Sequence, residues 1–306
     1  MTVLSQFVPL EMYFQKNPSE GLVQSGRTLA RYTGFHCGGK ADFFCDIYGI
    51  EGLKNVVMFC NTHSITLNVL GFGTNVLIAD EGICGAVVRL TGLPFLLCER
   101  LDEARFRVGS RVSLQKLIGV TCKAGLSGCE WLVGIPASLG GAVRLNAGAY
   151  GHDICESVES ITVMKPDGCL HTIDISQRLT GYRQGPCEPD EILVYADMAF
   201  SADDVSAISE RMTAISAERK RKIPPGRHAG CVFKNPPSIP AGKLLDELGC
   251  KGIAQQGACV SIEHANIIVN KSNAGSSDIL TLIERLINKA RSERNIELEL
   301  ELTIWR

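Results

Sequence analysis

The segment from residue 130 to residue 151, EWLVGIPASLGGAVRLNAGAYG, most constrains how this 306-residue chain can fold. It contains five glycines and four alanines, and positions with so little side chain are poorly suited to filling a core. Glycine also allows a backbone to approach a ligand closely. The segment therefore indicates a backbone lying along a large flat or phosphorylated ligand, and a buried structural crossing is the alternative.

A second glycine-rich loop, GFGTN at residues 71–75, lies between two apolar runs. Its backbone amides suit a phosphate group, although a tight β-turn explains the same residues. The loop lacks the dinucleotide pattern G-x-G-x-x-G, and no helical spacing follows it. The pattern predicts a strand, a turn and a strand over residues 65–80.

Short apolar runs broken by glycine continue to about residue 200 and predict a mainly β region. The spacing predicts strands at 85–90 and 105–114, a helix within 115–128 that ends at Gly125, and a hairpin over 157–173. From residue 202 the spacing becomes helical up to residue 222, and Pro-Pro-Gly follows. We place a domain boundary near residue 200. Beyond it the patterns predict helices at 241–249 and 276–294 and strands at 266–270 and 296–305.

Composition excludes several classes of function. The net charge is −2, so no general attraction to nucleic acid or an anionic membrane is expected. No apolar stretch reaches the roughly 18 residues of a membrane span, and the N-terminus lacks the pattern of a secretory signal. Thirteen cysteines occur without any C-x-x-C pair, so neither a zinc site nor a thioredoxin-type redox pair is expected. These features favour a cytoplasmic protein.

Eight motifs, taken in order, resemble one family. They are YTGFHCGGKADFF (32–44), GFGTNVLIAD (71–80), GLSGCEWLVGIPASLGGAVRLNAGAYG (125–151), GYR (181–183), GCVFKNP (230–236), AGKLLDELGCKG (241–252), GACVSIEHANIIVN (257–270) and LELEL (298–302). This series resembles the UDP-N-acetylenolpyruvoylglucosamine reductases, flavoenzymes of peptidoglycan precursor synthesis. The short distance between Arg183 and Cys231 resembles the shorter type, which lacks an extra loop with a substrate-contacting tyrosine.

The resemblance implies an α+β fold. A two-lobed FAD-binding domain of the vanillyl-alcohol-oxidase (PCMH) type would occupy residues 33–199, after an N-terminal segment 1–32. A C-terminal substrate-binding α+β domain would occupy residues 200–306. The implied reaction uses NADPH to reduce FAD, which then reduces the enolpyruvyl ether of a UDP-sugar. No nucleic acid, membrane or obligatory protein partner is implied.

The resemblance also implies three catalytic residues. Cys231 matches the position of the proton donor, where most members carry serine, and a thiol with a pKa of about 8.5 is mostly protonated at neutral pH. Arg183 matches the arginine that stabilises the developing enolate, to which a fixed positive charge is suited. Glu301 matches a glutamate that helps to stabilise or protonate the intermediate, and Glu299 is the alternative because it lies on the same strand face.

Further positions match residues that bind the cofactor and the substrate. The implied substrate-binding residues are Asn235, Lys251 and His264. The implied FAD-binding residues are Gly71, Phe72, Gly73, Thr74, Asn75, Gly134, Ile135, Pro136, Gly140, Gly141, Asn146, Gly148, Ala149, Tyr150 and Gly151.

The chain departs from the family pattern at Ala137, Gly185 and Leu300, where glycine, serine and proline are usual. These departures leave open a flavin- or nucleotide-sugar-binding protein without turnover. An FAD-dependent oxidase of the same fold is a further alternative.

Overall fold

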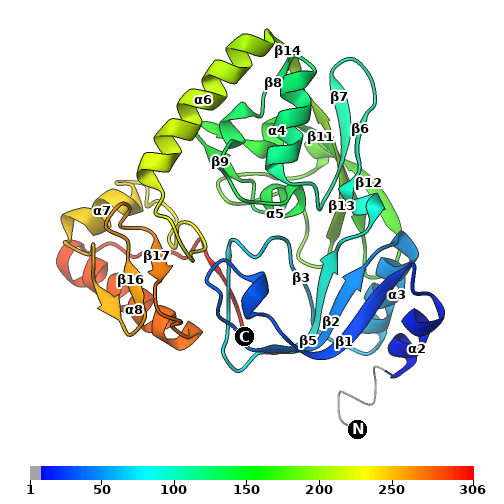
Figure 1. Cartoon of the computed structure of the whole chain (residues 1–306), viewed down its shortest axis with the longest axis horizontal. Coiled ribbons are helices and arrows are strands. Elements are labelled where there is room, and N and C mark those ends of the chain that lie inside the picture. The colour runs from blue at the N-terminus through cyan, green and yellow to red at the C-terminus, as the bar shows by residue number, and fades with distance from the viewer. Residues whose placement is uncertain (1–7) are drawn as a thin grey trace. The chain divides into compact units, whose positions relative to one another are not determined.

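The computed structural model describes residues 8–306, which form two compact units (Figure 1). Unit 1 contains the chain up to residue 25 together with residues 43–71 and 85–217, and unit 2 contains residues 26–42, 72–84 and 218–306. Both units are discontinuous in sequence because the chain passes between them repeatedly. The predicted domains 1–32, 33–199 and 200–306 each cover a continuous range of the sequence, and they stay a prediction.

A five-stranded antiparallel sheet lies at the centre of unit 1. Its order is β12 (Leu170–Asp174), β11 (Val158–Met164), β13 (Ile192–Ala199), β7 (Arg105–Gly109) and β6 (Cys98–Arg100). Strands expose alternate side chains on opposite faces. One face shares a core with helices α4 (Leu114–Lys123) and α5 (Leu139–Arg144), where Leu117, Val143 and Ala196 are fully buried.

A second sheet has the order β1 (Gly21–Thr28), β2 (Lys40–Ile47), β5 (Ile83–Leu90) and β3 (Leu67–Val69). Helices α2 (Val8–Lys16) and α3 (Ile50–Thr62) contribute apolar side chains to the core beside it. The Glu20 carboxylate accepts a 2.9 Å hydrogen bond from the Gly52 amide in the first turn of α3. A carboxylate there satisfies an amide that has no partner within the helix and complements the helix dipole.

Unit 2 builds its core from helices α7 (Ala241–Glu247) and α8 (Ser276–Arg294) and the small sheet β15 (Ala254–Gln255), β16 (Ala258–Val260) and β17 (Ile268–Asn270). Strand β18 (Thr303–Trp305) pairs in parallel with β4 (Val76–Ile78). Asp80, which follows β4, accepts hydrogen bonds from the amides of Ser276 and Ser277 at the start of α8. Burial alone would raise the pKa of Asp80, but these bonds lower it overall.

Helix α6 (Val205–Lys222) contains the division between the units. In unit 1, Arg211 of this helix bonds the buried carboxylate of Glu130. The remaining elements are short: β8 (Leu126–Ser127), β9 (Gly148–Ala149), β10 (His152–Asp153), β14 (Ser201–Ala202), and the 3-10 helices Ala30–Tyr32, Leu93–Leu96, Glu130–Leu132, Ile154–Ser157 and Ile175–Gln177.

Most predicted elements are present. The strand–turn–strand at 65–80, the hairpin at 157–173 and the helices at 202–222, 241–249 and 276–294 are confirmed within a few residues. The predicted strand at 105–114 ends at Gly109, because helix α4 begins at Leu114. The predicted closing strand at 296–305 is wrong over most of its length, since only Thr303–Trp305 is a strand and Leu300 forms an isolated bridge to Phe233.

Candidate active site

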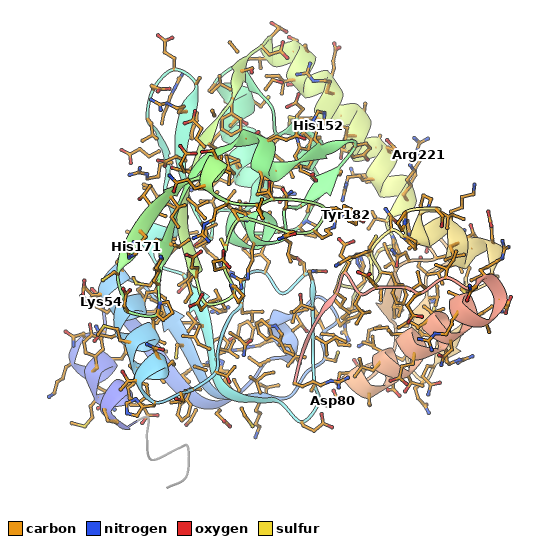
Figure 2. The ribbon with its side chains drawn as sticks, turned by 180° about the vertical axis from the view of Figure 1, so that it is seen from behind. Lys54, Asp80, His152, His171, Tyr182 and Arg221 are labelled. Atoms are coloured by element: carbon orange, nitrogen blue, oxygen red, sulfur yellow. The ribbon has the colours of Figure 1, made fainter. Side chains whose placement is uncertain are left out.

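The GYR motif forms a tight turn in unit 1. The Gly181 amide bonds the Gln184 carbonyl at 2.9 Å, and the Gln184 amide bonds the Gly181 carbonyl at 3.0 Å, so Tyr182 and Arg183 lie at the tip. Tyr182 is labelled in Figure 2. Arg183 has a φ of 57°, in the left-handed region that a residue with a Cβ adopts at an energetic cost. Its guanidinium lies 4.9 Å from the centre of the Tyr182 ring. A strained, non-glycine residue at a loop tip is typical of functional positions.

The predicted flavin-binding segment 134–151 contains helix α5, which the sequence patterns do not predict. Ser138 caps this helix, and its hydroxyl accepts a bond from the Gly141 amide at 3.4 Å. Apolar side chains of the segment, such as Val143, are buried, whereas Gly134 and Gly141 are exposed. The segment therefore has features of both predicted alternatives. Its apolar side chains are buried in the core, as in a structural crossing, and its glycine backbone is exposed at the surface of unit 1, where a ligand could lie along it.

The end of this segment is a tight hairpin. Strands β9 and β10 pair Gly148 with Asp153, and the connecting residues Tyr150 and Gly151 both have positive φ, 57° and 84°. Two positive φ angles define the twisted two-residue turn of β-hairpins, in which tyrosine is unusual. Asn146 also has a positive φ, 42°.

Gly71 lies against the same segment. A Cβ built on Gly71 would come within 2.8 Å of the Ser138 hydroxyl, so no side chain fits there without a shift. The Gly71 carbonyl accepts a 2.7 Å bond from the Arg111 guanidinium. Burial and the nearby charge of Arg89 lower the pKa of Arg111, and Asp46 partly offsets this effect. Sequence patterns did not identify Arg111, since a single arginine in a strand-like run carries no motif.

The residues of unit 1 fit a flavin nucleotide. The Ser110 hydroxyl is buried and has no hydrogen-bond partner within residues 8–306. Ser110 lies beneath the predicted cofactor segment, because its carbonyl accepts a bond from the Gly140 amide and a Cβ on Gly140 would lie 3.0 Å from Ser110 Cβ. A glycine-lined backbone beside an unsatisfied hydroxyl suits a large ligand rich in hydrogen-bonding groups.

Residues 72–75 belong to unit 2, where Gly73 is closely packed. Its φ is 68°, its carbonyl accepts a 2.8 Å bond from the Gly34 amide, and a Cβ would lie 2.0 Å from the Tyr32 carbonyl oxygen. The requirement for glycine at this position is therefore steric as well as conformational. At the end of the loop, the Asn75 side chain donates to the Glu301 carbonyl at 3.0 Å.

Cys231 begins the middle one of three adjacent backbone segments in unit 2. On one side it forms an antiparallel bridge with Ile267, and Val232 donates to the Asn266 carbonyl at 2.9 Å. On the other side, the Glu301 amide donates to the Val232 carbonyl at 2.8 Å. The segments that carry the predicted acid and the predicted glutamate are thus hydrogen-bonded neighbours.

The structure distinguishes the two candidate glutamates. The Glu299 side chain is 75% exposed and lies 3.5 Å from Lys234 Nζ in a surface ion pair. Glu301 is half-buried, and its backbone is bonded to both Val232 and Asn75. This setting favours Glu301, and its catalytic role stays a prediction.

The three predicted substrate-binding residues gather around helix α7. The side-chain oxygen of Asn235 accepts a 3.0 Å hydrogen bond from the Ala241 amide. His264 packs on the same helix, since a Cβ on Gly242 would lie 2.9 Å from its Cε1. Lys251 bonds Asp246 near the helix end at 2.7 Å.

Two positively charged side chains, Lys251 and Lys222, lie near His264. Burial, followed by the charges of Lys251 and Lys222, lowers the pKa of its imidazole. The sequence patterns did not place Lys222 near His264, because only the tertiary structure brings the two residues together. The cluster suits an anionic group such as a diphosphate.

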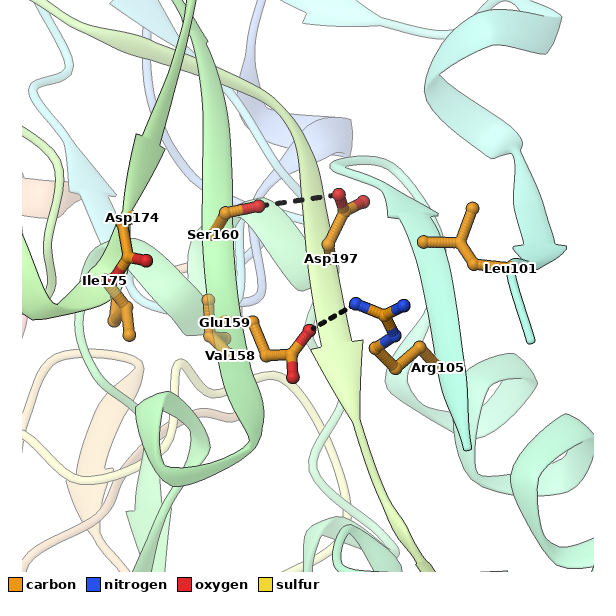
Figure 3. Close-up of a pocket in the computed structure, with 8 residues that line it drawn as sticks. All are labelled: Leu101, Arg105, Val158, Glu159, Ser160, Asp174, Ile175 and Asp197. Carbon is orange, nitrogen blue, oxygen red and sulfur yellow. Dashed lines mark hydrogen bonds and ion pairs between the residues drawn. The ribbon is translucent and has the colours of Figure 1, made fainter. Parts of the chain in front are cut away.

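A separate surface pocket lies on the five-stranded sheet of unit 1 (Figure 3). Two of its carboxylates already have partners, because Glu159 lies 3.6 Å from Arg105 and Asp197 accepts a bond from Ser160. None of the predicted site residues lines it. The full lining is Leu101, Arg105, Val158, Glu159, Ser160, Asp174, Ile175 and Asp197.

Within the described part of the chain, we found no helix long and apolar enough to cross a membrane, and no group of three or more metal-ligating side chains.

Comparison with known proteins decides the family. The family model for the UDP-N-acetylenolpyruvoylglucosamine reductase C-terminal domain matches residues 222–305, and the FAD binding domain model matches residues 49–174. The reductase of Syntrophus aciditrophicus is 36% identical, with 94% of this chain and 94% of that protein covered. The reductase of Listeria welshimeri is 35% identical, with 92% and 95% covered. This chain belongs to the UDP-N-acetylenolpyruvoylglucosamine reductase family.

A solved structure agrees with this assignment. The UDP-N-acetylenolpyruvylglucosamine reductase (MurB) of Thermus caldophilus has 34% sequence identity and a TM-score of 0.82, and the match covers 94% of this chain and 100% of that one. The predicted resemblance and the predicted fold class, an FAD-binding α+β portion followed by a C-terminal domain, are confirmed. The reductase family is an FAD-dependent one, and no finding favours the oxidase alternative.

Proposed function

We propose that this reductase-family protein uses NADPH to reduce the enolpyruvyl ether of UDP-N-acetylglucosamine-enolpyruvate to UDP-N-acetylmuramate, a step of peptidoglycan precursor synthesis. The supporting observation is the hydrogen-bonded pairing of the Cys231 and Glu301 segments in unit 2, with Asn75 of the GFGTN loop bonded to Glu301. Hydrogen bonds therefore connect the segment of the predicted acid, Cys231, with the predicted carboxylate residue, Glu301, and with Asn75 of the predicted phosphate-binding loop.

FAD, when bound, supplies the hydride that it has accepted from NADPH to the terminal carbon of the enolpyruvyl group. Negative charge then develops on the adjacent carbon and its carboxylate. The fixed charge of Arg183 stabilises this enolate, and Cys231 Sγ gives its proton to the adjacent carbon. The thiolate left on Cys231 recovers a proton from solvent, so that one hydride and one proton have been added across the double bond.

The other residues of unit 2 bind the nucleotide sugar in this proposal. Lys251 and the positive surroundings of His264 attract the diphosphate, and Asn235 contacts the sugar nucleotide beside helix α7. The Glu301 backbone is bonded to Val232 and Asn75, so the residue is held next to the Cys231 segment. We further propose that the enzyme works in the cytoplasm on this small-molecule substrate, without an obligatory protein partner.

An anaerobic absorbance titration tests the proposal in two steps. Purified protein loaded with FAD is expected to lose its yellow colour on addition of NADPH and to recover it stoichiometrically with the enolpyruvyl UDP-sugar. Reduction by NADPH without re-oxidation by the sugar would refute the proposed substrate. Rapid re-oxidation by air alone would indicate the oxidase, and failure to take up FAD would indicate a binding protein without turnover.

A further inference from the structure

Asn146 connects the predicted flavin-binding segment to the turn that carries Arg183. It lies two residues after helix α5 and is only 2% exposed. Its side-chain nitrogen donates to the Gly181 carbonyl at 2.9 Å, and its side-chain oxygen accepts from the Cys155 amide at 3.2 Å. The side chain therefore bonds protein at both ends, which differs from the cofactor-binding role that the family resemblance implied for it.

Residues 181–184 form the turn that carries Arg183, called the arginine turn below. The Gly181 carbonyl accepts the hydrogen bond that closes this turn. It accepts the Gln184 amide, which closes the turn, as well as the Asn146 side chain. Arg183 two residues later has a left-handed φ of 57°, which requires surroundings that hold the backbone in place. Asn146 supplies one such restraint directly at the base of the turn.

A second restraint acts on the other side of the turn. The Gly185 amide donates to the Arg144 carbonyl at 3.2 Å, and a Cβ on Gly185 would come within 2.0 Å of the Val143 carbonyl oxygen. The Arg144 guanidinium then bonds the carbonyls of Pro189 at 2.8 Å and Glu191 at 3.0 Å. Residues 181–191 are thus attached at several points to residues 143–146.

We propose that Asn146 is a positioning residue for Arg183, which fixes the arginine turn to the segment predicted to hold the flavin. The inference rests on the proposed function, since Arg183 acts there on the enolate. Because a displacement of about 1 Å can reduce a rate by about 10²-fold, loss of this restraint affects the step in which Arg183 takes part. Because the Asn146 side chain bonds protein groups at both ends, the proposal expects flavin binding and flavin reduction to be kept when this restraint is lost.

The test uses Asn146→Asp in the full-length, FAD-loaded protein. The aspartate keeps the shape and the acceptor for the Cys155 amide but places an oxygen against the Gly181 carbonyl. We expect normal flavin content, a normal rate of flavin reduction by NADPH, and re-oxidation by the enolpyruvyl sugar slowed by about 10²-fold. Asn146→Gly, which tolerates the φ of 42° and removes both bonds, is the second variant if the aspartate prevents folding.

A double-mutant cycle with Arg183→Ala separates positioning from general stability. If Asn146 acts through Arg183, Asn146→Asp slows re-oxidation by less than about twofold in the Arg183→Ala background. An undiminished effect in that background would overturn the proposal, as would loss of flavin affinity with unchanged re-oxidation. Should the unsubstituted protein itself fail to reduce the sugar, the proposed function is refuted, whereas an additive cycle on active protein refutes only the positioning role.

Asn270→Asp is the matched control. Asn270 is also 2% exposed, and its side-chain nitrogen donates to the carbonyls of Phe35 at 2.9 Å and Ala274 at 3.0 Å, within unit 2. This variant loses the same kind of buried donor without touching the arginine turn. We expect Asn270→Asp to lower the melting temperature and to show no coupling with Arg183→Ala in the rate of re-oxidation. If Asn270→Asp slowed re-oxidation as much as Asn146→Asp does, and this effect also depended on Arg183, a specific role for Asn146 would be refuted.

Discussion

The Asn75 side chain donates a 3.0 Å hydrogen bond to the backbone carbonyl of Glu301, although the two residues are 226 positions apart. The Asn75 carbonyl accepts a bond from the Thr303 amide at 3.1 Å, and the Glu301 amide donates to Val232 at 2.8 Å. The C-terminal segment is therefore held between the GFGTN loop and the Cys231 segment. This arrangement explains how a glutamate near the end of the chain is placed beside residues from the middle of the sequence.

Replacing Cys231 by alanine removes the proposed proton donor. We expect the reduction of FAD by NADPH to be nearly unchanged and the re-oxidation by the enolpyruvyl sugar to fall by about 10²–10⁴-fold, since this is the usual contribution of a general acid. Cys231→Ser is expected to keep substantial activity because a hydroxyl also carries a proton. Stopped-flow absorbance measures the two half-reactions separately, and normal re-oxidation in the alanine variant would exclude Cys231 as the acid.

The two glutamates offer a matched pair. Glu301→Gln is expected to slow re-oxidation by about 10²-fold or more, because it removes the carboxylate of a half-buried residue whose backbone is bonded to the Cys231 segment. Glu299→Gln disrupts only the exposed ion pair with Lys234, which contributes little to stability or function. Single-turnover rates of both variants decide the assignment, and a larger effect at Glu299 would reverse it.

The left-handed backbone conformation of Arg183 is expected to lower the stability of the folded protein. Since glycine adopts a positive φ without the clash of a Cβ, Arg183→Gly is expected to be more stable than Arg183→Ala by about 1 kcal/mol. Both variants are expected to lose the oxidation of reduced flavin by the sugar, with Arg183→Lys retaining more. Urea unfolding of the FAD-loaded variants gives the stability difference. Equal stability of the glycine and alanine variants would show that the turn is unstrained.

The charge environment of His264 makes stability depend on pH. Its pKa is lowered in the folded protein, so between the unfolded value of about 6.5 and the folded value the unfolded chain binds more protons. The stabilising contribution is complete above about pH 6.5 and is lost as the pH falls toward the folded pKa. His264→Gln is expected to lose less stability than the unsubstituted protein between pH 7 and pH 5. Parallel pH-dependent unfolding curves for the two proteins would contradict this.

The order of short motifs was sufficient to predict the family, because glycine, proline and charged residues at loops carry specific backbone and chemical requirements. Leucine alternates with glutamate over residues 298–302, and Leu298 and Leu302 are buried while Leu300 packs against the same core. This alternation could not predict the backbone partners: the amides of Glu301 and Leu302 both bond the Val232 carbonyl, which interrupts a regular ladder. Side-chain periodicity reports burial and not hydrogen-bond register.

Residues that act through tertiary proximity were beyond the reach of sequence patterns. Arg111 bonds the Gly71 carbonyl from 40 positions away, and Lys222 influences His264 from 42 positions away. Asn146 stands inside a motif that the resemblance associated with FAD, so its bond to Gly181 was not anticipated. Each requires knowledge of which loops meet in space.

Gly185 has a practical consequence for protein engineering. A side chain at this position would meet the carbonyl oxygens of Val143 and Arg144 at 2.0 and 2.5 Å, so the serine that the family resemblance implied here cannot replace it without moving the backbone. A chimaera that takes only the arginine turn and a serine at position 185 from a homologue would therefore place the serine side chain against these two carbonyl oxygens. Exchange between homologues is expected to succeed when the loop and its supporting helix are transplanted together, as a single cassette.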